Sequence, residues 1–300
     1  MVISSFLQSS GAGPSVKGSL PAPRPVRTAL LAVLCALSPG VGATPDTIAH
    51  WTFEQATGPI VDTRTPGDRD DPSVVRGSDG QVGYSPGEGD DGEVDRDGSR
   101  AGFNGERDSI ILIDGARHTD FNPGAGSMAV TVRFMIDRSV LDIEALGPNE
   151  TWNLVQKGRF NNAGGQWKLQ IRKNRSERVF FQCLVNDDEP DTPRAAAQIA
   201  MSHAWILDGD TLEGRCTIDR ETDTLRVELT DTTRGIDVLQ VTKRLPSGFG
   251  AVAPRAGECG SPESFGENVA IGNKPMCPDQ ELDTDDAFRG EVHSVRLDRP

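Results

Sequence analysis

Trp152-Asn-Leu-Val-Gln-Lys-Gly-Arg-Phe160 and Gln166-Trp-Lys-Leu-Gln-Ile171 form the stretch of sequence that decides the fold. Between them stands Gly164-Gly165, and glycine supplies the positive φ angles that tight turns need. Two later segments, Phe181-Gln-Cys183 and Arg215-Cys-Thr-Ile218, each present a cysteine on a strand-like run. The pattern predicts neighbouring antiparallel strands in a β-sheet protein that is cross-linked in an oxidising compartment.

Short strand-like segments recur along the rest of the chain, and no long segment has the 3.6-residue period of an amphipathic helix. We therefore expect an all-β fold in which two antiparallel sheets pack as a jelly-roll sandwich, with one short helical turn near residues 140–146. The expected strands are Thr47–Phe53, Ser109–Ile113, Ser127–Ile136, Val179–Val185, Gly214–Ile218, Thr224–Thr230, Val269–Ile271 and Gly290–Leu297.

The chain divides into a leader and one domain. Residues 1–43 contain three basic and no acidic residues, an apolar run from Ala29 to Leu37, and a Val-Gly-Ala ending, which is the pattern of a secretory signal with a long basic leader. The apolar run is shorter than the roughly 20 residues that span a bilayer. We expect a secreted protein, extracellular or associated with the cell surface, whose single domain covers 44–300 and includes a long acidic Gly/Asp-rich loop at about 63–102.

Four cysteines remain after the leader: Cys183, Cys216, Cys259 and Cys277. An even number in a secreted chain favours two disulfides, with three possible connectivities. Pairing in sequence order, Cys183 with Cys216 and Cys259 with Cys277, best fits strands that neighbour each other. A zinc site is disfavoured because none of these cysteines forms a CxxC pair.

The net charge of −14 becomes −17 when the leader, with its three basic residues, is removed. Such acidity disfavours nucleic acid and anionic lipid as partners. It is compatible with bound calcium, and more simply with solubility.

Several segments resemble the laminin-G-like jelly roll of the concanavalin A-like lectin/glucanase superfamily, in its secreted bacterial form. The similar segments are Ala49–Glu54, Phe103–Asp108, Met128–Phe134, Asn153–Gly158, Gly165–Lys168, Ile271–Lys274 and Phe288–Arg296. This superfamily includes carbohydrate-binding modules, glucanases, polysaccharide lyases and protein-binding domains, so the resemblance implies the fold and leaves the function open.

The resemblance also implies a structural calcium ion between an acid of the first strand and an aspartate of the last. Glu54 matches the first position, whereas His293 stands where the aspartate is expected. Asp62, Asp108 and Asp298 are the alternative ligands, and each can equally be a surface charge. A second calcium hypothesis places a loop at residues 93–99, although Asn104 replaces the bidentate acid of an EF-hand.

Large aromatic side chains are expected in the core of a sandwich, and this is the first interpretation of Trp51, Trp152, Trp167 and Trp205. A basic island beside the Gly164-Gly165 turn is the candidate glycan site. Its members are Lys157, Arg159, Lys168 and Arg172, with Trp167 as a sugar platform. The alternative is a solvated strand face.

No catalytic residue is predicted. Glu93, Asp95 and Asp97 alternate as the paired carboxylates of a glycosidase would, but they stand among glycines and aspartates that favour a solvated loop. The four histidines are scattered, and no nucleophile triad is suggested by their spacing.

The sequence therefore favours a secreted, non-catalytic and monomeric binding domain that recognises a glycan or an extracellular protein partner. A polysaccharide hydrolase or lyase and a structural cell-surface module are the alternatives. Structural calcium is the one cofactor considered.

Overall fold

The structure of the chain is a computed structural model. It describes residues 46–53, 73–76, 95–96, 101–104, 110–113, 119–136, 151–158, 164–176, 178–187, 193–201, 210–254, 268–274 and 286–300. All of them belong to one compact unit, Ala43–Pro300. The leader at 1–43 and the helical turn expected near residues 140–146 lie outside the described residues.

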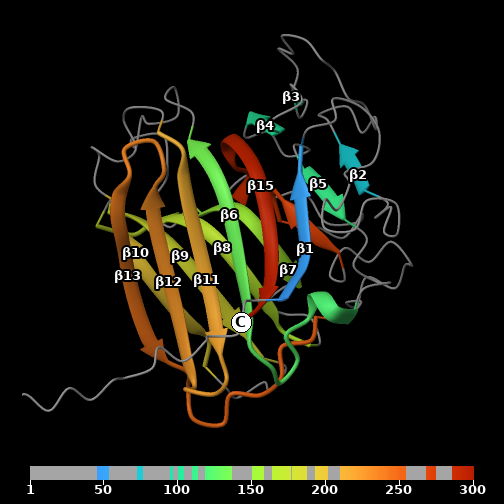
Figure 1. Cartoon of the computed structure of the whole chain (residues 1–300), viewed down its shortest axis with the longest axis vertical. Coiled ribbons are helices and arrows are strands. Elements are labelled where there is room, and N and C mark those ends of the chain that lie inside the picture. Colours follow the sequence, from blue (N-terminus) through green and yellow to red (C-terminus); the bar gives the residue numbers. More distant parts are fainter. Residues whose placement is uncertain are drawn as a thin grey trace, which may run out of the picture. The chain divides into compact units, whose positions relative to one another are not determined.

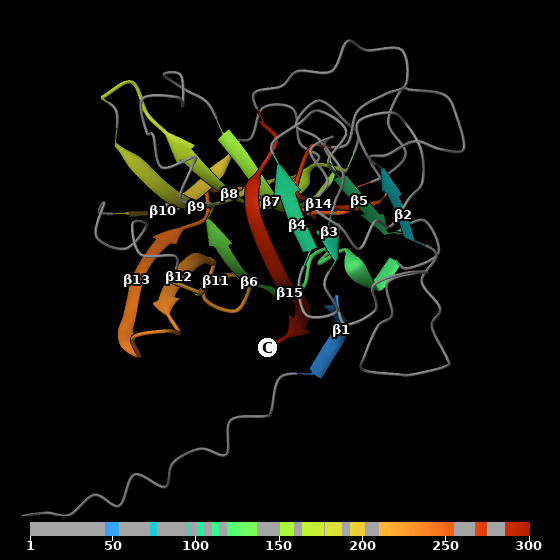
Figure 2. The same ribbon diagram turned by 90° about the horizontal axis from the view of Figure 1, so that it is seen from above.

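The described residues form two antiparallel sheets, which Figure 2 shows as two layers. The eight-stranded sheet has the order β13-β12-β11-β6-β15-β4-β3, and β1 also pairs with β15. The long last strand β15 pairs with β4 through its first residues and with β1 through its later ones. The bounds are β1 Asp46–Thr52, β3 Asp95–Arg96, β4 Ala101–Asn104, β6 Met128–Ile136, β11 Leu212–Asp219, β12 Thr224–Asp231, β13 Ile236–Arg244 and β15 Arg289–Arg299.

The seven-stranded sheet lies behind the first in Figure 1, in the order β10-β9-β8-β7-β14-β5-β2. The two segments on either side of Gly164-Gly165 are its adjacent strands β7 and β8. Gly158, Gly164 and Gly165 have φ angles of 80°, 87° and 74°, so the turn between these strands uses glycine where other residues would be strained. The bounds are β2 Ser73–Arg76, β5 Ile110–Ile113, β7 Thr151–Gly158, β8 Gln166–Lys173, β9 Val179–Asn186, β10 Ala195–Ala200 and β14 Val269–Ile271.

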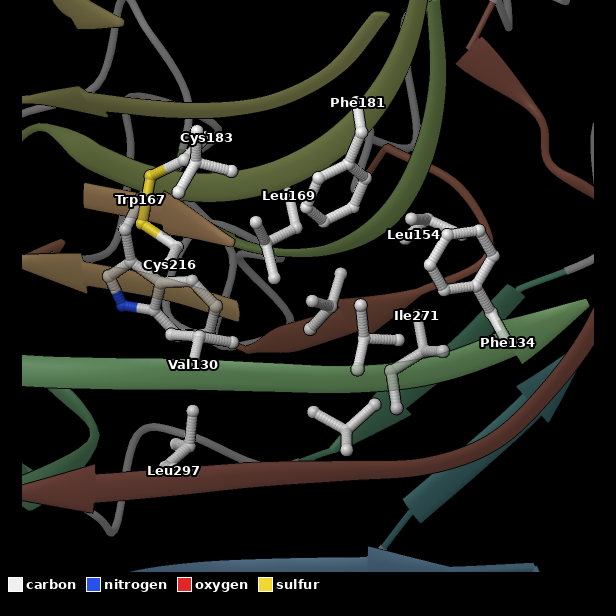
Figure 3. Packing of buried hydrophobic residues seen from close by; sticks show 14 of the residues in the cluster. Val130, Phe134, Leu154, Trp167, Leu169, Phe181, Cys183, Cys216, Ile271 and Leu297 are labelled. Atoms are coloured by element: carbon white, nitrogen blue, oxygen red, sulfur yellow. A yellow bond between two sulfur atoms is a disulfide. The ribbon is translucent and has the colours of Figure 1, made fainter. Parts of the chain in front are cut away.

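The core fills the space between the sheets, because alternate side chains of each strand point inward. Trp51, Trp152 and Trp167 are all part of this core. Figure 3 shows how the two sheets meet, with Phe134 of β6 against Phe181 of β9, whose rings stack at 5.8 Å between centroids. The core interpretation is therefore confirmed for these three tryptophans, and Trp205 lies outside the described residues.

A disulfide joins Cys183 to Cys216 across this core, as Figure 3 shows. The pairing is the expected one, but its reason differs from the one given by the sequence, since Cys183 is in β9 and Cys216 is in β11 of the other sheet. Their Cα atoms are 5.6 Å apart. Nearby, Gly214 of β11 faces the Phe181 ring, which an added Cβ would overlap, so glycine lets the sheets approach closely here.

The all-β, two-sheet sandwich predicted from the sequence is confirmed. The eight predicted strands correspond to β1, β5, β6, β9, β11, β12, β14 and β15. Two long strands, β10 and β13, were not predicted, and β2 and β3 lie within the stretch expected to be a loop at 63–102. The one helical element among the described residues is a single 3-10 turn, η1 at Thr119–Phe121.

Candidate functional site

Strand β8 supplies the centre of the candidate site. Trp167, Leu169 and Ile171 point into the core, where each is at most 1% exposed. Alternation then places Lys168, Gln170 and Arg172 on the outer face of the seven-stranded sheet. The polar residues that occupy every second position of β8 are therefore presented together on one surface.

The same alternation divides the basic island predicted from the sequence. Lys168 and Arg172 lie on the outer face, whereas Trp167 is inside, with its indole N–H donating to the Phe121 carbonyl at 3.2 Å. Lys157 lies opposite Trp167 in the β7–β8 register, shares its face and is buried. Trp167 is therefore placed as a core residue rather than as a sugar platform, and Arg159 lies outside the described residues.

A row of four amide side chains crosses the outer face, and we call it the amide row. It consists of Asn153 in β7, Gln170 in β8, Gln182 in β9 and Gln198 in β10, each directly opposite the next in the strand register. Gln170 Nε2 donates to Gln182 Oε1, and Gln182 Nε2 donates to Gln198 Oε1 at 3.1 Å. The hydrogen bonds therefore all run in one direction across β8, β9 and β10.

The row is incomplete between Asn153 and Gln170. Asn153 Nδ2, a donor, and Gln170 Oε1, an acceptor, are both buried and have no hydrogen-bond partner. Leaving a buried polar atom unpaired costs about 1–3 kcal/mol, and few such atoms occur in native structures. A group that accepts from one of these atoms and donates to the other would complete the row.

Lys168 lies beside this gap, and we call Lys168 and the three cations that act on it, Arg172, Arg194 and Lys274, the basic cluster. Lys168 Nζ donates to Asn153 Oδ1 at 3.5 Å. Burial lowers the pKa of Lys168 to about 8; Asp286 acts to raise that pKa, while Lys274, Arg194 and Arg172 lower it further. The ammonium thus experiences an excess of positive charge from its neighbours.

Among the described residues, Asp286 is the carboxylate that acts on Lys168, and it is already engaged. Asp286 Oδ2 pairs with Lys274 at 3.0 Å, and its Oδ1 accepts from the Thr151 hydroxyl. Among the described residues no carboxylate forms an ion pair with Lys168 or Arg172. Lys168 and Arg172 are thus basic side chains on the outer face of the seven-stranded sheet, in a protein whose net charge is −14.

The outer face of the eight-stranded sheet offers a different surface. A groove of about 490 Å³ lies across β1, β6, β11 and β15 and is lined by polar side chains, among them His50, Arg133, Glu213, His293 and Arg296. A β-bulge between Val292 and Ser294 directs His293 into it. Arg133 lies opposite Glu213 in the strand register, so both signs of charge are present.

Asp298, one of the predicted calcium ligands, lies on this second face and is 1% exposed. Its Oδ2 accepts from Arg215 and Arg296, each at 3.1 Å, and its Oδ1 accepts from the Thr47 hydroxyl at 2.9 Å. Both carboxylate oxygens are thus occupied by donors, two of them cationic. In this arrangement Asp298 neutralises arginines and does not present an open ligand to a cation.

Several predicted residues cannot be placed. No group of three or more His, Cys, Asp or Glu side chains that could hold a metal ion occurs among the described residues. Asp95 belongs to strand β3. The predicted residues outside the described part of the chain are Glu54, Asp62, Glu93, Asp97, Asp108, Cys259 and Cys277.

The sequence did not predict the amide row, because neutral amides are neither charged, aromatic nor typical metal ligands. Gln182 lies in an otherwise apolar run, and Gln198 belongs to the unpredicted strand β10. The available signal was the alternation of Gln166, Lys168, Gln170 and Arg172 with large apolar residues, which marks a polar outer face on a strand.

Comparisons with known proteins identify the fold. No family model matches the sequence, and no curated protein matches it. The binding domain of Paraclostridial Mosquitocidal Protein 1 is similar in structure, with a TM-score of 0.51 and 10% identity over 85% of this chain and 48% of that chain.

Two other solved structures are more distant. The binding domain of botulinum neurotoxin serotype D/C has a TM-score of 0.48 at 10% identity, over 85% of this chain and 49% of that chain. The carbohydrate-binding module CBM40 of the Ruminococcus gnavus sialidase has a TM-score of 0.37 at 10% identity, over 58% of this chain and 76% of that chain. The chain spans less than half the length of the mosquitocidal and neurotoxin binding-domain structures that it matches. At 10% identity the similarity to the mosquitocidal binding domain shows the β-sandwich fold alone.

The part of the chain that the structure describes contains no helix with the length and hydropathy of a membrane span.

Proposed function

We propose that this chain is a secreted, non-catalytic glycan-binding domain, and that the glycan lies on the outer face of the seven-stranded sheet. The observation that carries the proposal is the gap in the amide row between Asn153 and Gln170. The resemblance to the laminin-G-like family is part of this proposal, as is export by the leader at 1–43.

The chemistry of the gap favours a hydroxyl group. An amide N–H of Asn153 needs an acceptor and the carbonyl oxygen of Gln170 needs a donor, and both atoms are buried. A hydroxyl accepts and donates at the same time, and sugars carry hydroxyls in every ring. Lys168 and Arg172 flank Gln170 on the same strand face and remain partly exposed, so further groups of the ligand can be bound beside the gap.

The fold itself is compatible with binding. The mosquitocidal protein's binding domain has the same sandwich architecture. Because such folds serve many unrelated functions, the ligand class is argued from the site alone.

The test is a glycan array followed by calorimetry on the bound sugars. Gln170→Leu removes the acceptor at the gap while keeping a similar volume, and we expect affinity to fall by at least about tenfold, as for one lost buried hydrogen bond. Gln240→Leu is the matched control, because Gln240 is an exposed amide on β13 of the other sheet, and it should leave affinity unchanged.

A blank array would contradict the proposal, and so would equal binding by the wild type and the Gln170→Leu variant. A protein partner is the alternative occupant of the same face. Capture of a protein that glycosidase treatment does not release, together with a blank array, would favour that alternative.

A further inference from the structure

We infer that the groove on the outer face of the eight-stranded sheet binds a small zwitterion of the free α-amino acid class. The inference goes beyond the proposed function, because this groove and the amide row lie on the outer faces of different sheets. It is carried by one row of polar side chains that crosses β11, β6, β15 and β1, which lie side by side in Figure 1.

We call this row the open row, and it consists of Glu213 in β11, Arg133 in β6, Ser294 in β15 and Thr52 in β1. Each residue lies directly opposite the next in the strand register. All four line the groove, where Arg133 and Glu213 are exposed and the two hydroxyl residues are partly exposed. In the part of the chain that the structure describes, none of the four side chains forms a hydrogen bond or an ion pair.

The side chains next to the open row are engaged with one another. Arg215 and Arg296 both donate to Asp298 Oδ2 at 3.1 Å, and Arg215 also donates to the Thr131 hydroxyl at 3.2 Å. These bonds hold the neighbouring row in place. The open row therefore lies beside a fixed polar surface, and its own donors and acceptors face the groove.

The order of charges along the open row determines the ligand class. Glu213 and Arg133 lie on neighbouring strands, and directly opposed residues have Cβ atoms about 5 Å apart. An α-amino acid carries its ammonium and its carboxylate on one carbon. The ammonium can therefore pair with Glu213 while the carboxylate accepts two hydrogen bonds from the Arg133 guanidinium. The hydroxyls of Ser294 and Thr52 lie beyond Arg133, where they can bind a polar side chain of the ligand.

Ligands with a single charge fit the open row less well. A carboxylate bound at Arg133 would lie beside the like charge of Glu213, and an amine bound at Glu213 would lie beside Arg133. A direct ion pair between the two residues is the competing arrangement. An exposed pair contributes only about 0–1 kcal/mol, so a zwitterion that satisfies both charges replaces such a pair at small cost.

The rest of the groove narrows the class further. Its volume of about 490 Å³ lies in the range of small-molecule pockets, and every side chain that lines it is polar, which disfavours an apolar ligand. A metal ion is disfavoured because the described residues contain no group of three or more His, Cys, Asp or Glu side chains that could hold one.

The experiment measures the binding of free amino acids to the full chain by calorimetry. The probes are glycine, serine and glutamine, each beside its N-acetyl form, which lacks the ammonium, and its amide, which lacks the carboxylate. We expect at least one free amino acid to bind, and both of its modified forms to bind at least about tenfold more weakly, as for one lost charged contact. Equal affinity of the three forms would overturn the inference, and so would the absence of binding at millimolar concentrations.

Charge-swap variants test the roles of the two charged residues. Arg133→Glu or Glu213→Arg alone places like charges side by side and should lower glycine affinity at least about tenfold. The double swap again presents one charge of each sign, so glycine affinity should return to within about threefold of the wild type. A folded double variant that does not recover binding would overturn the assignment, and the melting temperature shows whether each variant is folded.

Two further variants serve as controls. Arg226→Gln removes a cation of the same sheet that does not line the groove, and Gln170→Leu changes the amide row on the other sheet. Neither should alter amino-acid affinity. Equal losses in Arg226→Gln and Arg133→Glu would show nonspecific attraction and overturn the inference. A blank glycan array together with amino-acid binding would overturn the proposed glycan site and support this one.

Discussion

The outer faces of the two sheets are both polar, but they differ in how their charged side chains are paired. On the eight-stranded sheet the buried carboxylate of Asp298 receives two arginines, and Arg226 pairs with Glu228. On the seven-stranded sheet burial and neighbouring cations lower the pKa of Lys168, and in the part of the chain that the structure describes no carboxylate forms an ion pair with Lys168 or Arg172. Paired charges stabilise a fold, whereas a buried ammonium without an ion pair carries a desolvation cost.

The largest expected effect concerns the covalent link between the two sheets. Replacing Cys183 and Cys216 by alanine should lower the free energy of unfolding by about 3–4 kcal/mol, because the bridge closes a segment of 33 residues in the unfolded chain. Urea unfolding at 25 °C measures the loss. Glycan affinity should survive in the folded variant, since both elements of the site lie on the seven-stranded sheet. A stability loss below about 1 kcal/mol would contradict this expectation.

The next effect tests the outer face of the eight-stranded sheet. Asp298→Ala leaves two arginine side chains and the Thr47 hydroxyl without their shared acceptor. We expect a loss of about 2–3 kcal/mol, below the range for a fully buried pair because Arg215 and Arg296 are partly exposed. Thermal and urea unfolding should show this loss, with no change in glycan affinity. A variant as stable as the wild type would mean that this face is not held by its charge pairs.

Lys168 on the seven-stranded sheet should respond with the opposite sign. Lys168→Met removes an ammonium whose pKa is lowered by burial and by neighbouring cations, so we expect stability to rise by about 1 kcal/mol at pH 7 while glycan affinity falls. Lys243→Met, at an exposed position on β13, is the matched control and should change neither quantity. Destabilisation by Lys168→Met would show that the cluster serves the fold rather than a ligand.

The free energy of unfolding should also depend on pH because of Lys168. Because its pKa is lowered to about 8 in the folded state, the unfolded chain holds more protons between pH 8 and about 10.5. The destabilisation that charged Lys168 causes in the folded state is therefore fully present below pH 8, and it decreases as the pH rises from 8 to about 10.5. The stability difference between Lys168→Met and the wild type should shrink accordingly between pH 7 and pH 10, and a constant difference would contradict the assignment.

The smallest effect is expected at the exposed charge pair on the outer face of the eight-stranded sheet. Arg226 Nε lies 3.5 Å from Glu228 Oε2, and the two side chains are 41% and 20% exposed. A double-mutant cycle with alanine should give a coupling energy below about 0.5 kcal/mol, which salt at 0.5 M should abolish. A larger coupling would show that even the exposed pairs of this face contribute to the fold.

Local pattern was sufficient for most of the architecture. The alternation in β6 and β12 and the apolar run of β5 are signals within single segments, and each identified a strand. Strand β10 was not predicted because its alanines, Ala195, Ala196 and Ala197, have no strong strand preference. Its extended conformation depends on pairing with β9. Strand β13 is an edge strand whose residues 239–244 are largely exposed, and so it lacks the apolar alternation that identified the others.

The candidate site was predictable only in part. Lys168 and Arg172 were identified because they are charged and adjacent, but Lys157 and Trp167 were grouped with them although they share the opposite face of the sheet. Which side chains of two neighbouring strands share a face depends on the strand register, and the sequence does not give that register. The amide row depends on the register of four strands at once.

The sequence by itself determined the all-β sandwich and the two strands on either side of Gly164-Gly165, because periodicity and turn residues are local properties, and it reduced the cysteine pairings to three. Only the tertiary structure decided that Cys183 and Cys216 join opposite sheets, that Asp298 is paired with arginines, and that four amides lie with Lys168 and Arg172 on one face. Those contacts join residues up to 251 positions apart, and they form only where register and sheet packing bring the side chains together.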